Sequence, residues 1–410
     1  MYGAAVRDLS RLELVTEAVR AVLEWMAREA KHLLDGLIDE DWALRYGRPV
    51  QLGSQPTRPQ TRFKQAGADA YLLLQRLADH GGPPVEALRQ IFLQNFLLDG
   101  SGRPRPRTDT DGLPPGLLRI ISPYDLQARF AIRGDTRWSG YLLHITETCQ
   151  EEDTSVNLIT DVATDLPTSD KPAVPGIYQR LQRRALLPEQ HMVDGGYVSA
   201  ALLDQAATSY QVTMVGPVKK NTSWQHRAGT GFSIDNFVID FDRRQAICPN
   251  GKASSNWLEP PAQAPYQVVK FSRAYCGPCL DRDRCTRSQE PRTGRTLTFL
   301  PQHLFERQVA NRDQQQQERW QRTYASRAGV EGTINEAVNA HQARQCRYRG
   351  LAKTHLQHVL TAIAINIERL AAREPPGEHH PRPPTAFQRY LEAHALPRPR
   401  WWRQGQKGTG

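Results

Sequence analysis

The sequence has no apolar stretch approaching the roughly 18–20 residues needed to cross a bilayer, and no signal peptide opens it. These absences argue against a membrane-spanning or secreted protein, so a cytoplasmic location is the default expectation. Cysteine is scarce, with 6 in 410 residues. In a reducing compartment we expect these cysteines to be free thiols or metal ligands rather than disulfides.

Acidic residues are outnumbered by basic ones. The chain has 53 Lys and Arg against 43 Asp and Glu, a formal charge of +10. Residues 344–410 hold twelve Lys or Arg against four Glu and no Asp, so most of the surplus lies in this last sixth of the chain. A clustered positive surplus is typical of a nucleic-acid-binding protein. A solvated basic tail explains the same surplus, and charge alone does not separate the two.

Apolar periodicity divides the chain into regions. Residues 10–36 and 84–98 carry apolar stripes at helical spacing and predict a helical region over 1–99. Glycine, proline and charge without a period predict a linker at 100–119. Further on, strands at 138–148 and 155–164 are followed by alternating helices and strands at 174–186, 187–194, 199–208 and 210–215. This order predicts an α/β fold with a mixed sheet flanked by helices.

Four cysteines form a compact group in the next region. Cys248, Cys276, Cys279 and Cys285 give C-P-x-G and then C-x2-C-x5-C within 38 residues. Four soft ligands, two of them at x2 spacing, predict a tetrahedral structural Zn2+ site. An iron–sulfur cluster uses the same ligands, and four unrelated thiols are the plain alternative. Cys149 and Cys346 lie apart and are expected to be ordinary residues.

Two acids are candidates for chemistry. Asp194 ends an apolar run in HMVDGGYVSA, where Gly195 and Gly196 would let a substrate backbone approach. The alternative is a simple Asp-Gly-Gly turn. Tyr324, Arg327 and Glu331 are spaced three and then four apart, which puts all three on one face of a helix. They suit phosphate binding near a metal, although a solvated Arg–Glu pair has the same spacing.

Seven segments, in order, resemble the DDE transposases of bacterial insertion sequences. They are SPYDLQARF, WSGYLLHITET, VDGGY, CPNG, CGPCLDRDRC, YASRAGVEGT and RYRGLAKTHLQHVLTAIAINIERL. The resemblance covers roughly residues 120–372, in the branch whose ribonuclease H-like domain carries a cysteine-rich insertion. It implies a ribonuclease H-like core at 120–217 and 301–373, a four-cysteine zinc-ribbon-like insertion at 218–300, and a basic tail at 374–410 that we expect to be disordered.

The resemblance also implies function. It assigns the second and third catalytic acids to Asp194 and Glu331, which would hold Mg2+ or Mn2+, with Tyr324 and Arg327 beside them. Two-metal phosphoryl transfer would then cleave double-stranded DNA at terminal inverted repeats and join it to target DNA. Relatives often place a basic residue seven positions after the glutamate, where this chain has Val338. The DNA contacts are therefore expected from Arg344, Arg347, Arg349 and Lys353, in a homodimer on nucleoid DNA.

The first catalytic acid is the main departure from the family. Relatives carry it in an Asp-Ser/Gly-Thr motif on the opening strand, ahead of a segment like AAVRDLSRLEL, whereas this chain begins at Met1-Tyr2-Gly3. We therefore expect a truncated amino end, an unpaired sheet edge and weakened or lost activity. Asp8 and Asp125 are the available substitutes, but Asp8 is better explained as the N-cap of the following helix.

Three function classes follow. The first is a metal-dependent transposase. The second is a catalytically dead DNA-binding remnant or regulator. The third, an unrelated zinc-ribbon protein with a basic tail, explains the cysteines but not Asp194 together with Glu331.

Overall fold

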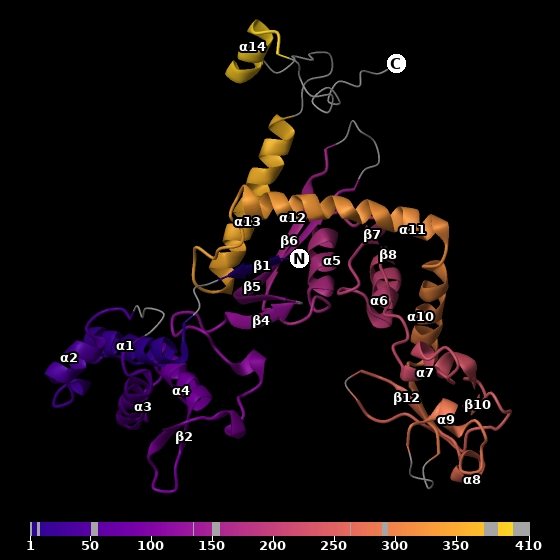
Figure 1. Cartoon of the computed structure of the whole chain (residues 1–410), viewed down its shortest axis with the longest axis horizontal. Coiled ribbons are helices and arrows are strands. Elements are labelled where there is room, and N and C mark those ends of the chain that lie inside the picture. The colour runs from indigo at the N-terminus through magenta and orange to yellow at the C-terminus, as the bar shows by residue number, and fades with distance from the viewer. Residues whose placement is uncertain are drawn as a thin grey trace. The chain divides into compact units, whose positions relative to one another are not determined.

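A computed structural model describes residues 2–5, 9–50, 56–133, 135–149, 156–262, 264–288, 294–372 and 384–396 (Figure 1). The chain divides into two compact units, Met1–Asn366 and Ile367–Gly410. The architecture is mixed α/β with several small sheets, which fits the α/β prediction and a ribonuclease H-like domain. Among the described residues, no helix combines the length and apolar character that a membrane crossing requires.

Four helices enclose the first hydrophobic core. They are α1 (Arg11–Glu29), α2 (Glu40–Tyr46), α3 (Pro59–Arg76) and α4 (Pro83–Asn95). The predicted stripe of the first helix is buried at Leu14, Val15 and Val19, among others, because residues three and four apart share a helix face. Ser10 caps α1 in a capping box with Glu13. The prediction that Asp8 is the cap is therefore wrong, and Asp8 itself lies outside the described residues.

A small hairpin follows these helices. β2 (Phe96–Leu98) pairs antiparallel with β3 (Pro104–Pro106), which lies inside the stretch predicted to be a linker. Two short 3-10 helices, Asp109–Asp111 and Gly116–Leu118, complete that stretch. Composition alone therefore missed local order here.

The central sheet is built around one long strand, β5 (Thr136–Glu147). β4 (Arg129–Arg133) and β6 (Ile159–Asp165) pair with it antiparallel, and β1 (Tyr2–Ala5) also pairs with it antiparallel. Leu142 and Leu143 pair with both β1 and β6, and Gly140 pairs with both β1 and β4, so β1 lies on the opposite edge of β5 from the other two. The predicted neighbouring strand pair is confirmed as β5 and β6.

The opening strand is short rather than absent. β1 covers Gly140–Leu143 of β5, and beyond it no described strand pairs with residues 144–147 on the same edge. The predicted unpaired edge stays a prediction, because residue 1, which would come opposite His144, lies outside the described residues.

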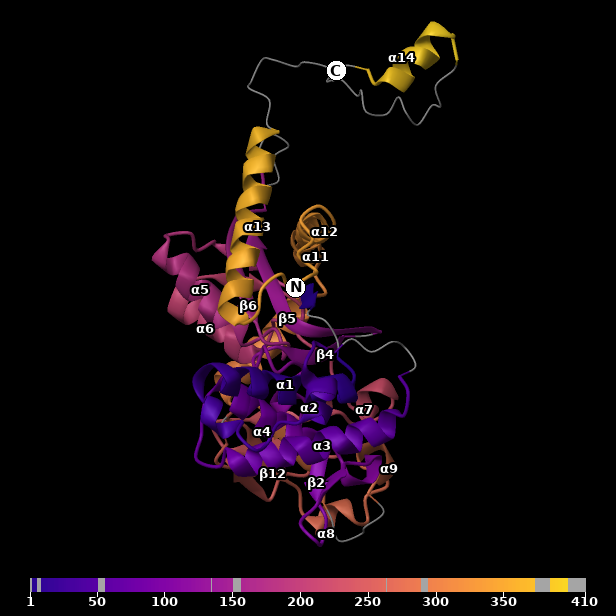
Figure 2. The same cartoon turned by 90° about the vertical axis from the view of Figure 1, so that its left-hand side faces the viewer.

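A second, parallel pair of strands carries the residues leading to Asp194. β7 (Gln190–Met192) pairs with β8 (Thr213–Val215). The helices α5 (Ala173–Arg183) and α6 (Ala200–Tyr210) share a core with these strands through Val174, Ile177 and Met214. Figure 2 shows α5 and α6 on one side of β5 and β6, and α12 on the other.

The C-terminal helices are α10 (Gln302–Gln314), α11 (Glu318–Ala325), α12 (Gly329–Asn339) and α13 (Leu351–Ala371). α12 and α13 cover the other face of the sheet, whereas α10 contacts α6, where Arg307 pairs with Asp204. Leu143 and Val162 of the sheet pack against Ala337 and Ala362. In β6, Val162 faces this core and Ala163 faces that of α5, as alternation in a strand requires.

The cysteine-rich region has its own core, built on Phe237, Phe271 and Phe299. Its elements are α7 (Trp224–Arg227), β9 (Val238–Asp240), β10 (Gln245–Ile247), β11 (Asn256–Leu258), β12 (Gln267–Lys270), α8 (Arg273–Cys276), α9 (Arg282–Cys285) and β13 (Thr296–Phe299). β11, β12 and β13 form one antiparallel sheet, and β9 and β10 form a second.

In the second unit the structure describes α14 (Ala386–Ala393), capped by Thr385. This helix lies within the predicted basic tail. The rest of that tail, residues 374–383 and 397–410, is outside the described residues.

Candidate active site

A cavity of about 680 Å3 lies against the end of β5, the end of β7 and the start of α12. Three carboxylates line it, those of Glu147, Asp194 and Glu331, and they are the acids among its described lining residues. The structure therefore places the two predicted acids on one cavity, although they lie 137 positions apart in the sequence. Among the described residues, the carboxylate oxygens of Glu147, Asp194 and Glu331 do not all lie within 4.8 Å of one another, so binding one ion would draw them closer. Carboxylate oxygens are the donors that Mg2+ prefers, so the lining fits a divalent cation by chemistry.

Asp194 sits in a tight turn directly after β7. Its Oδ1 accepts a hydrogen bond from the Gly195 N–H at 2.6 Å, and its backbone oxygen accepts one from the Tyr197 N–H at 2.9 Å. Asp194 therefore both forms a turn and lines the cavity, so a turn at Asp-Gly-Gly does not exclude a role for Asp194 in the site.

The two glycines after Asp194 lie close to other parts of the chain. A Cβ at Gly196 would lie 2.2 Å from Oδ2 of the buried Asp170, and a Cβ at Gly195 would lie 3.3 Å from Pro217. Gly196 therefore makes room for the Asp170 side chain, and the approach of a substrate backbone at these glycines stays a prediction.

Tyr324, Arg327 and Glu331 form a connected row. The Arg327 guanidinium lies 5.5 Å from the Tyr324 ring centroid and donates to Oε1 of Glu331 at 2.8 Å. The row is not on one α-helix, because α11 ends at Ala325 and a 3-10 turn, Ser326–Ala328, precedes α12. Arg327 and Glu331 line the cavity, whereas Tyr324 stands just outside its lining.

The charges of this row depend on burial and on Asp194. Burial raises the pKa of the Tyr324 phenol, and the negative Asp194 adds to that rise. For Arg327, burial alone lowers the pKa, but the hydrogen bond to Glu331 and the charges of Tyr324 and Asp194 raise it overall. Both groups therefore keep their protons at neutral pH, and both can donate to a phosphate oxygen.

Glu147 was missed by sequence reasoning. It is the last residue of β5 and accepts a hydrogen bond of 2.5 Å at Oε2 from the hydroxyl of the buried Thr333 on α12. Its position is the sequence feature that could have indicated it, because Glu147 is the acid that ends the apolar strand within WSGYLLHITET. An acid at the end of an antiparallel strand is common, however, and only the packing of α12 on β5 turns this one toward the cavity.

A buried histidine supports the floor of the cavity. His144 Nδ1 lies 2.6 Å from the Tyr197 hydroxyl, and its Nε2 lies 3.6 Å from Oδ2 of Asp165. Which of the two groups donates depends on the imidazole tautomer, and the 3.6 Å contact to Asp165 is too long for a hydrogen bond. The contact with His144 fixes the ring of Tyr197, which lies three residues after Asp194. Both His144 and Tyr197 line the cavity.

Asp125, considered as a substitute first acid, has another role. Its buried carboxylate accepts from the Tyr141 hydroxyl at 2.6 Å, the Gly350 N–H at 2.8 Å, and two backbone N–H groups at residues 127 and 128. It does not line the cavity. Asp125 thus joins β5 to the start of α13 as a structural residue.

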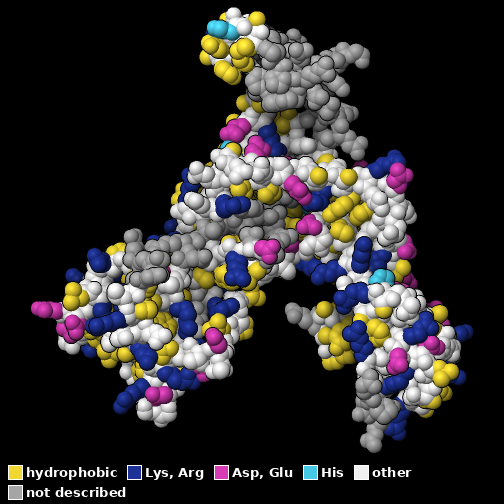
Figure 3. All heavy atoms as spheres, in the orientation of Figure 1, with side chains coloured by type: hydrophobic (Ala, Val, Ile, Leu, Met, Phe, Trp, Pro, Cys, Tyr) yellow, Lys and Arg dark blue, Asp and Glu magenta, His cyan; other side chains and the backbone are white. Residues whose placement is uncertain are grey.

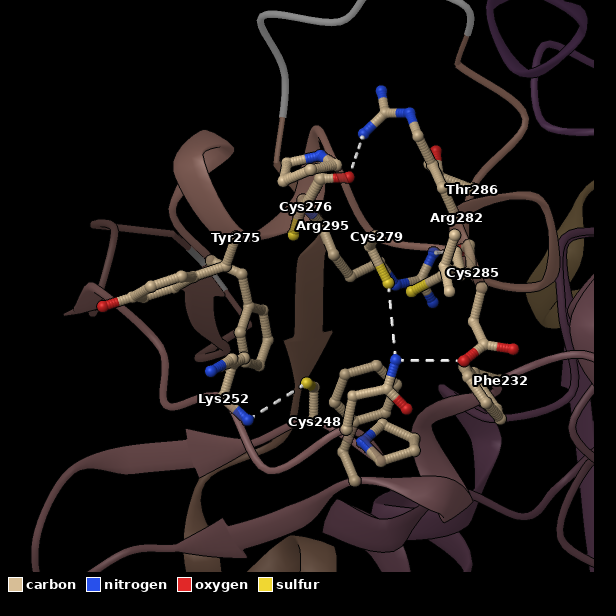
Figure 4. A pocket seen from close by; sticks show the side chains of 17 residues that line it. Phe232, Cys248, Lys252, Tyr275, Cys276, Cys279, Arg282, Cys285, Thr286 and Arg295 are labelled. Atoms are coloured by element: carbon tan, nitrogen blue, oxygen red, sulfur yellow. Dashed lines mark hydrogen bonds between the residues drawn. The ribbon is translucent and has the colours of Figure 1, made fainter.

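The four cysteines of the insertion line one hollow of about 370 Å3 (Figure 4). Two backbone N–H groups point at sulfur, Lys252 N–H at Cys248 (3.4 Å) and Arg295 N–H at Cys276 (3.5 Å), and the Asn250 amide points at Cys279 (3.4 Å). Such N–H groups favour thiolates and suit a metal knuckle. Cys285 completes the set, so the donors fit Zn2+.

The sulfurs are not drawn together as tightly as zinc needs. Among the described residues, no three of these sulfurs lie within 4.8 Å of one another, whereas ligands of one zinc would lie roughly 3.8 Å apart. Burial raises the pKa of the Cys285 thiol to about 11, and the other three cysteines contribute to that rise. Zinc binding would therefore draw the sulfurs inward and release protons.

The predicted DNA-binding residues lie away from the cavity. Arg344, Arg347 and Arg349 are exposed on the segment before α13, and Lys353 is exposed in its first turn. Arg349 stacks over Tyr124, with 4.5 Å between guanidinium and ring centroid. None of these four basic residues lines the acid cavity.

Residues 247–371 match the family model described as a transposase DDE domain. The matched stretch runs from the residue before Cys248 to the end of α13 and includes Glu331, whereas Asp194 lies outside it. No curated protein and no solved structure matches the chain. The match supports a transposase-type function, and such a family implies DNA binding and dependence on a divalent metal.

Proposed function

We propose that this chain is the transposase of a bacterial insertion sequence, which cleaves DNA at the element's ends and transfers the strand to target DNA. The observation that carries the proposal is the cavity that holds Glu147, Asp194 and Glu331 beside Arg327. It occurs in a chain whose residues 247–371 match a transposase DDE domain.

In this proposal, the three carboxylates hold Mg2+ or Mn2+. Metal ions bound there would activate water or a 3′-hydroxyl and stabilise the leaving oxygen of the phosphodiester. Arg327, held between the Tyr324 ring and Glu331, would orient a non-bridging phosphate oxygen through its paired N–H groups. The protonated Tyr324 would donate a second hydrogen bond to the phosphate. Arg344, Arg347, Arg349 and Lys353 would bind flanking DNA, and the homodimer on paired ends stays part of the proposal.

Glu147 takes the place of the acid that the resemblance assigns to the opening strand. It is the last residue of β5 and lines the cavity. A glutamate is longer than an aspartate by one methylene, which helps it reach across from the adjacent strand. Asp194 and Glu331 keep the roles of second and third acid.

The cysteine-rich region has a folding role in this proposal. Cys248, Cys276, Cys279 and Cys285 would hold one structural Zn2+, which leaves no open position for a substrate. The metal would fix α8 and α9 against the aromatic core of the insertion.

The alternative is a catalytically inactive DNA-binding remnant or regulator. It holds if Glu147 does not serve as the first metal ligand, because β1 (Tyr2–Ala5) carries no acid. A metal site with only Asp194 and Glu331 would be underligated.

The test is a Mg2+-dependent cleavage and strand-transfer assay on DNA that carries the element's own ends. Each of Asp194→Asn, Glu331→Gln and Glu147→Gln should lower the cleavage rate about 100-fold or more, because each removes a metal ligand. Glu306→Gln, which alters an exposed acid on α10 outside the cavity, should leave the rate unchanged.

The outcomes separate the two functions. Full activity in Glu147→Gln, with loss in the other two variants, would remove Glu147 from the site. DNA binding without cleavage would support the alternative, more strongly so if cleavage appears once an Asp-bearing strand is added ahead of Tyr2.

A further inference from the structure

α11 carries two aromatic side chains that stack on each other next to the candidate active site. Trp320 and Tyr324 lie one helical turn apart, with ring centroids at 4.9 Å and an interplanar angle of 18°. Arg327 lies over the other end of this pair and donates to Glu331. The row therefore runs from Trp320 to a carboxylate of the cavity.

This aromatic pair lies outside the hydrophobic cores of the described residues. None of the eight residues of α11 is buried, and neither ring belongs to any of the four hydrophobic cores of the described chain. Trp320 and Tyr324 are each half-buried. A helix that folds only to fill a core would place its tryptophan inside that core.

The surroundings of the pair are basic. Arg319 and Arg322 are exposed on the same helix, and Arg322 pairs with Glu318. Arg312, near the end of α10, donates to the backbone oxygen of Lys219 at 3.2 Å. The end of α10, the helix before α11, therefore lies beside the basic residues 219–220. Figure 3 shows Lys and Arg side chains (dark blue) gathered near α7 and α10. Cations next to an accessible aromatic face fit a nucleic acid strand better than an apolar partner.

We propose that Trp320 and Tyr324 form a stacking platform for an unpaired nucleobase of the DNA strand that enters the cavity. A base inside a duplex does not expose its face, so the platform selects an end that is frayed or forked. Stacking is indifferent to base identity, so the platform positions the strand without reading its sequence. The inference rests on the proposed function only in that the ligand is DNA.

The test compares two oligonucleotides without added Mg2+, so that no cleavage is needed. One is a forked duplex with 2-aminopurine in its unpaired arm, and the other is the same duplex fully paired. Wild-type protein should bind the forked DNA more tightly and quench the 2-aminopurine. Trp320→Leu should weaken forked binding about tenfold and abolish the quenching, while paired DNA is bound within about twofold of wild type. Trp320→Phe should restore most of both.

A matched control is Phe387→Leu, which removes an exposed aromatic residue on α14. It should leave the preference for forked DNA intact. Far-ultraviolet circular dichroism of each variant checks folding, and α11 is exposed enough to tolerate the changes.

The failures are distinguishable. If wild-type protein binds neither DNA, the proposed function fails. If it binds both equally, or if quenching persists in Trp320→Leu, the platform is overturned and the proposed function stands. A change of oligomeric state in Trp320→Leu, measured by light scattering, would overturn it too, because the face would then be a protein interface.

Discussion

Asp125 and Asp194 are both aspartates next to the sheet, and their hydrogen bonds give them different roles. Asp125 is buried and accepts four hydrogen bonds from three segments of the chain. Asp194 is half-buried and lines a cavity. A carboxylate whose lone pairs are fully used within the fold has little left for a metal ion, so residue-level geometry separates a structural acid from a candidate catalytic one.

This difference predicts the effect of removing the Tyr141 hydroxyl. Tyr141→Phe deletes the 2.6 Å donor to the buried Asp125, and burial already holds the pKa of that phenol above its usual range. The free energy of unfolding should fall by about 1.5–3 kcal/mol, because a hydrogen bond to a buried charge is lost. Urea denaturation measures this.

The control is Tyr390→Phe, an exposed tyrosine on α14, which should change the unfolding free energy by less than about 0.5 kcal/mol. Equal stability of wild type and Tyr141→Phe would mean that Asp125 does not carry a charge-assisted bond in solution.

At this scale, the sequence predicted Asp194 and Glu331 as partners only through a family resemblance. Spacing linked Tyr324, Arg327 and Glu331, since residues three and four apart meet on helical turns. Nothing local could link Glu147 to them, because its approach depends on how α12 packs against β5. A contact between residues that are far apart in the sequence produces no periodic pattern from which it could be predicted.

At the scale of elements, glycines inside helices show how packing overrides propensity. Gly67 lies within α3, where a Cβ would come within 2.3 Å of the Phe96 ring in the first core. Gly332 lies within α12, where a Cβ would meet nothing within 4 Å. Alanine favours a helix over glycine by roughly 1 kcal/mol, so only the surroundings differ between the two sites.

The two alanine variants should therefore change stability in opposite directions. Gly67→Ala should destabilise by about 1–3 kcal/mol, since Phe96 must move in a packed core. Gly332→Ala should stabilise by about 0.5–1 kcal/mol. Thermal denaturation of the two variants beside wild type gives the comparison. A stabilising Gly67→Ala would show that the α3–Phe96 contact is looser than described.

Element prediction succeeded where the period was long. The helices α1 and α4 were predicted from stripes of three or more turns, and the β5–β6 pair from two adjacent apolar runs. β1 and β3 were missed because each has four residues or fewer, and such strands exist only through pairing with a partner. The 3-10 turn between α11 and α12 left no mark, since its spacing resembles that of an α-helix.

At the scale of the whole molecule, the chain combines several small cores. The helical region packs around Val15 and Leu88, the two faces of the sheet each have a core, and the cysteine-rich region has an aromatic one. The last of these has short strands and helices of only four residues, α7, α8 and α9. A region of this kind is usually stabilised by a metal or by disulfides.

The proposed zinc site makes the stability of this region dependent on metal and pH. Purified protein should carry one Zn2+ per chain by native mass spectrometry, and Cys279→Ser should lose it, whereas Cys149→Ser, at a cysteine outside the group, should keep it. The raised pKa of Cys285, about 11 without metal, means that binding must displace a proton near neutral pH. Protons and zinc therefore compete, and zinc affinity should fall as pH falls from 8 to 5.

Competition with a chromogenic chelator across that pH range measures this trend. Metal removal at pH 7.5 should change the tryptophan fluorescence and make protease sites in residues 218–300 accessible. Added zinc should reverse both changes. If the purified protein instead contains iron and shows a visible absorption band, the four cysteines hold an iron–sulfur cluster rather than zinc. Protein that is free of both metals and equally resistant to protease would show that the aromatic core of this region folds without a metal, and the four cysteines would then be ordinary thiols.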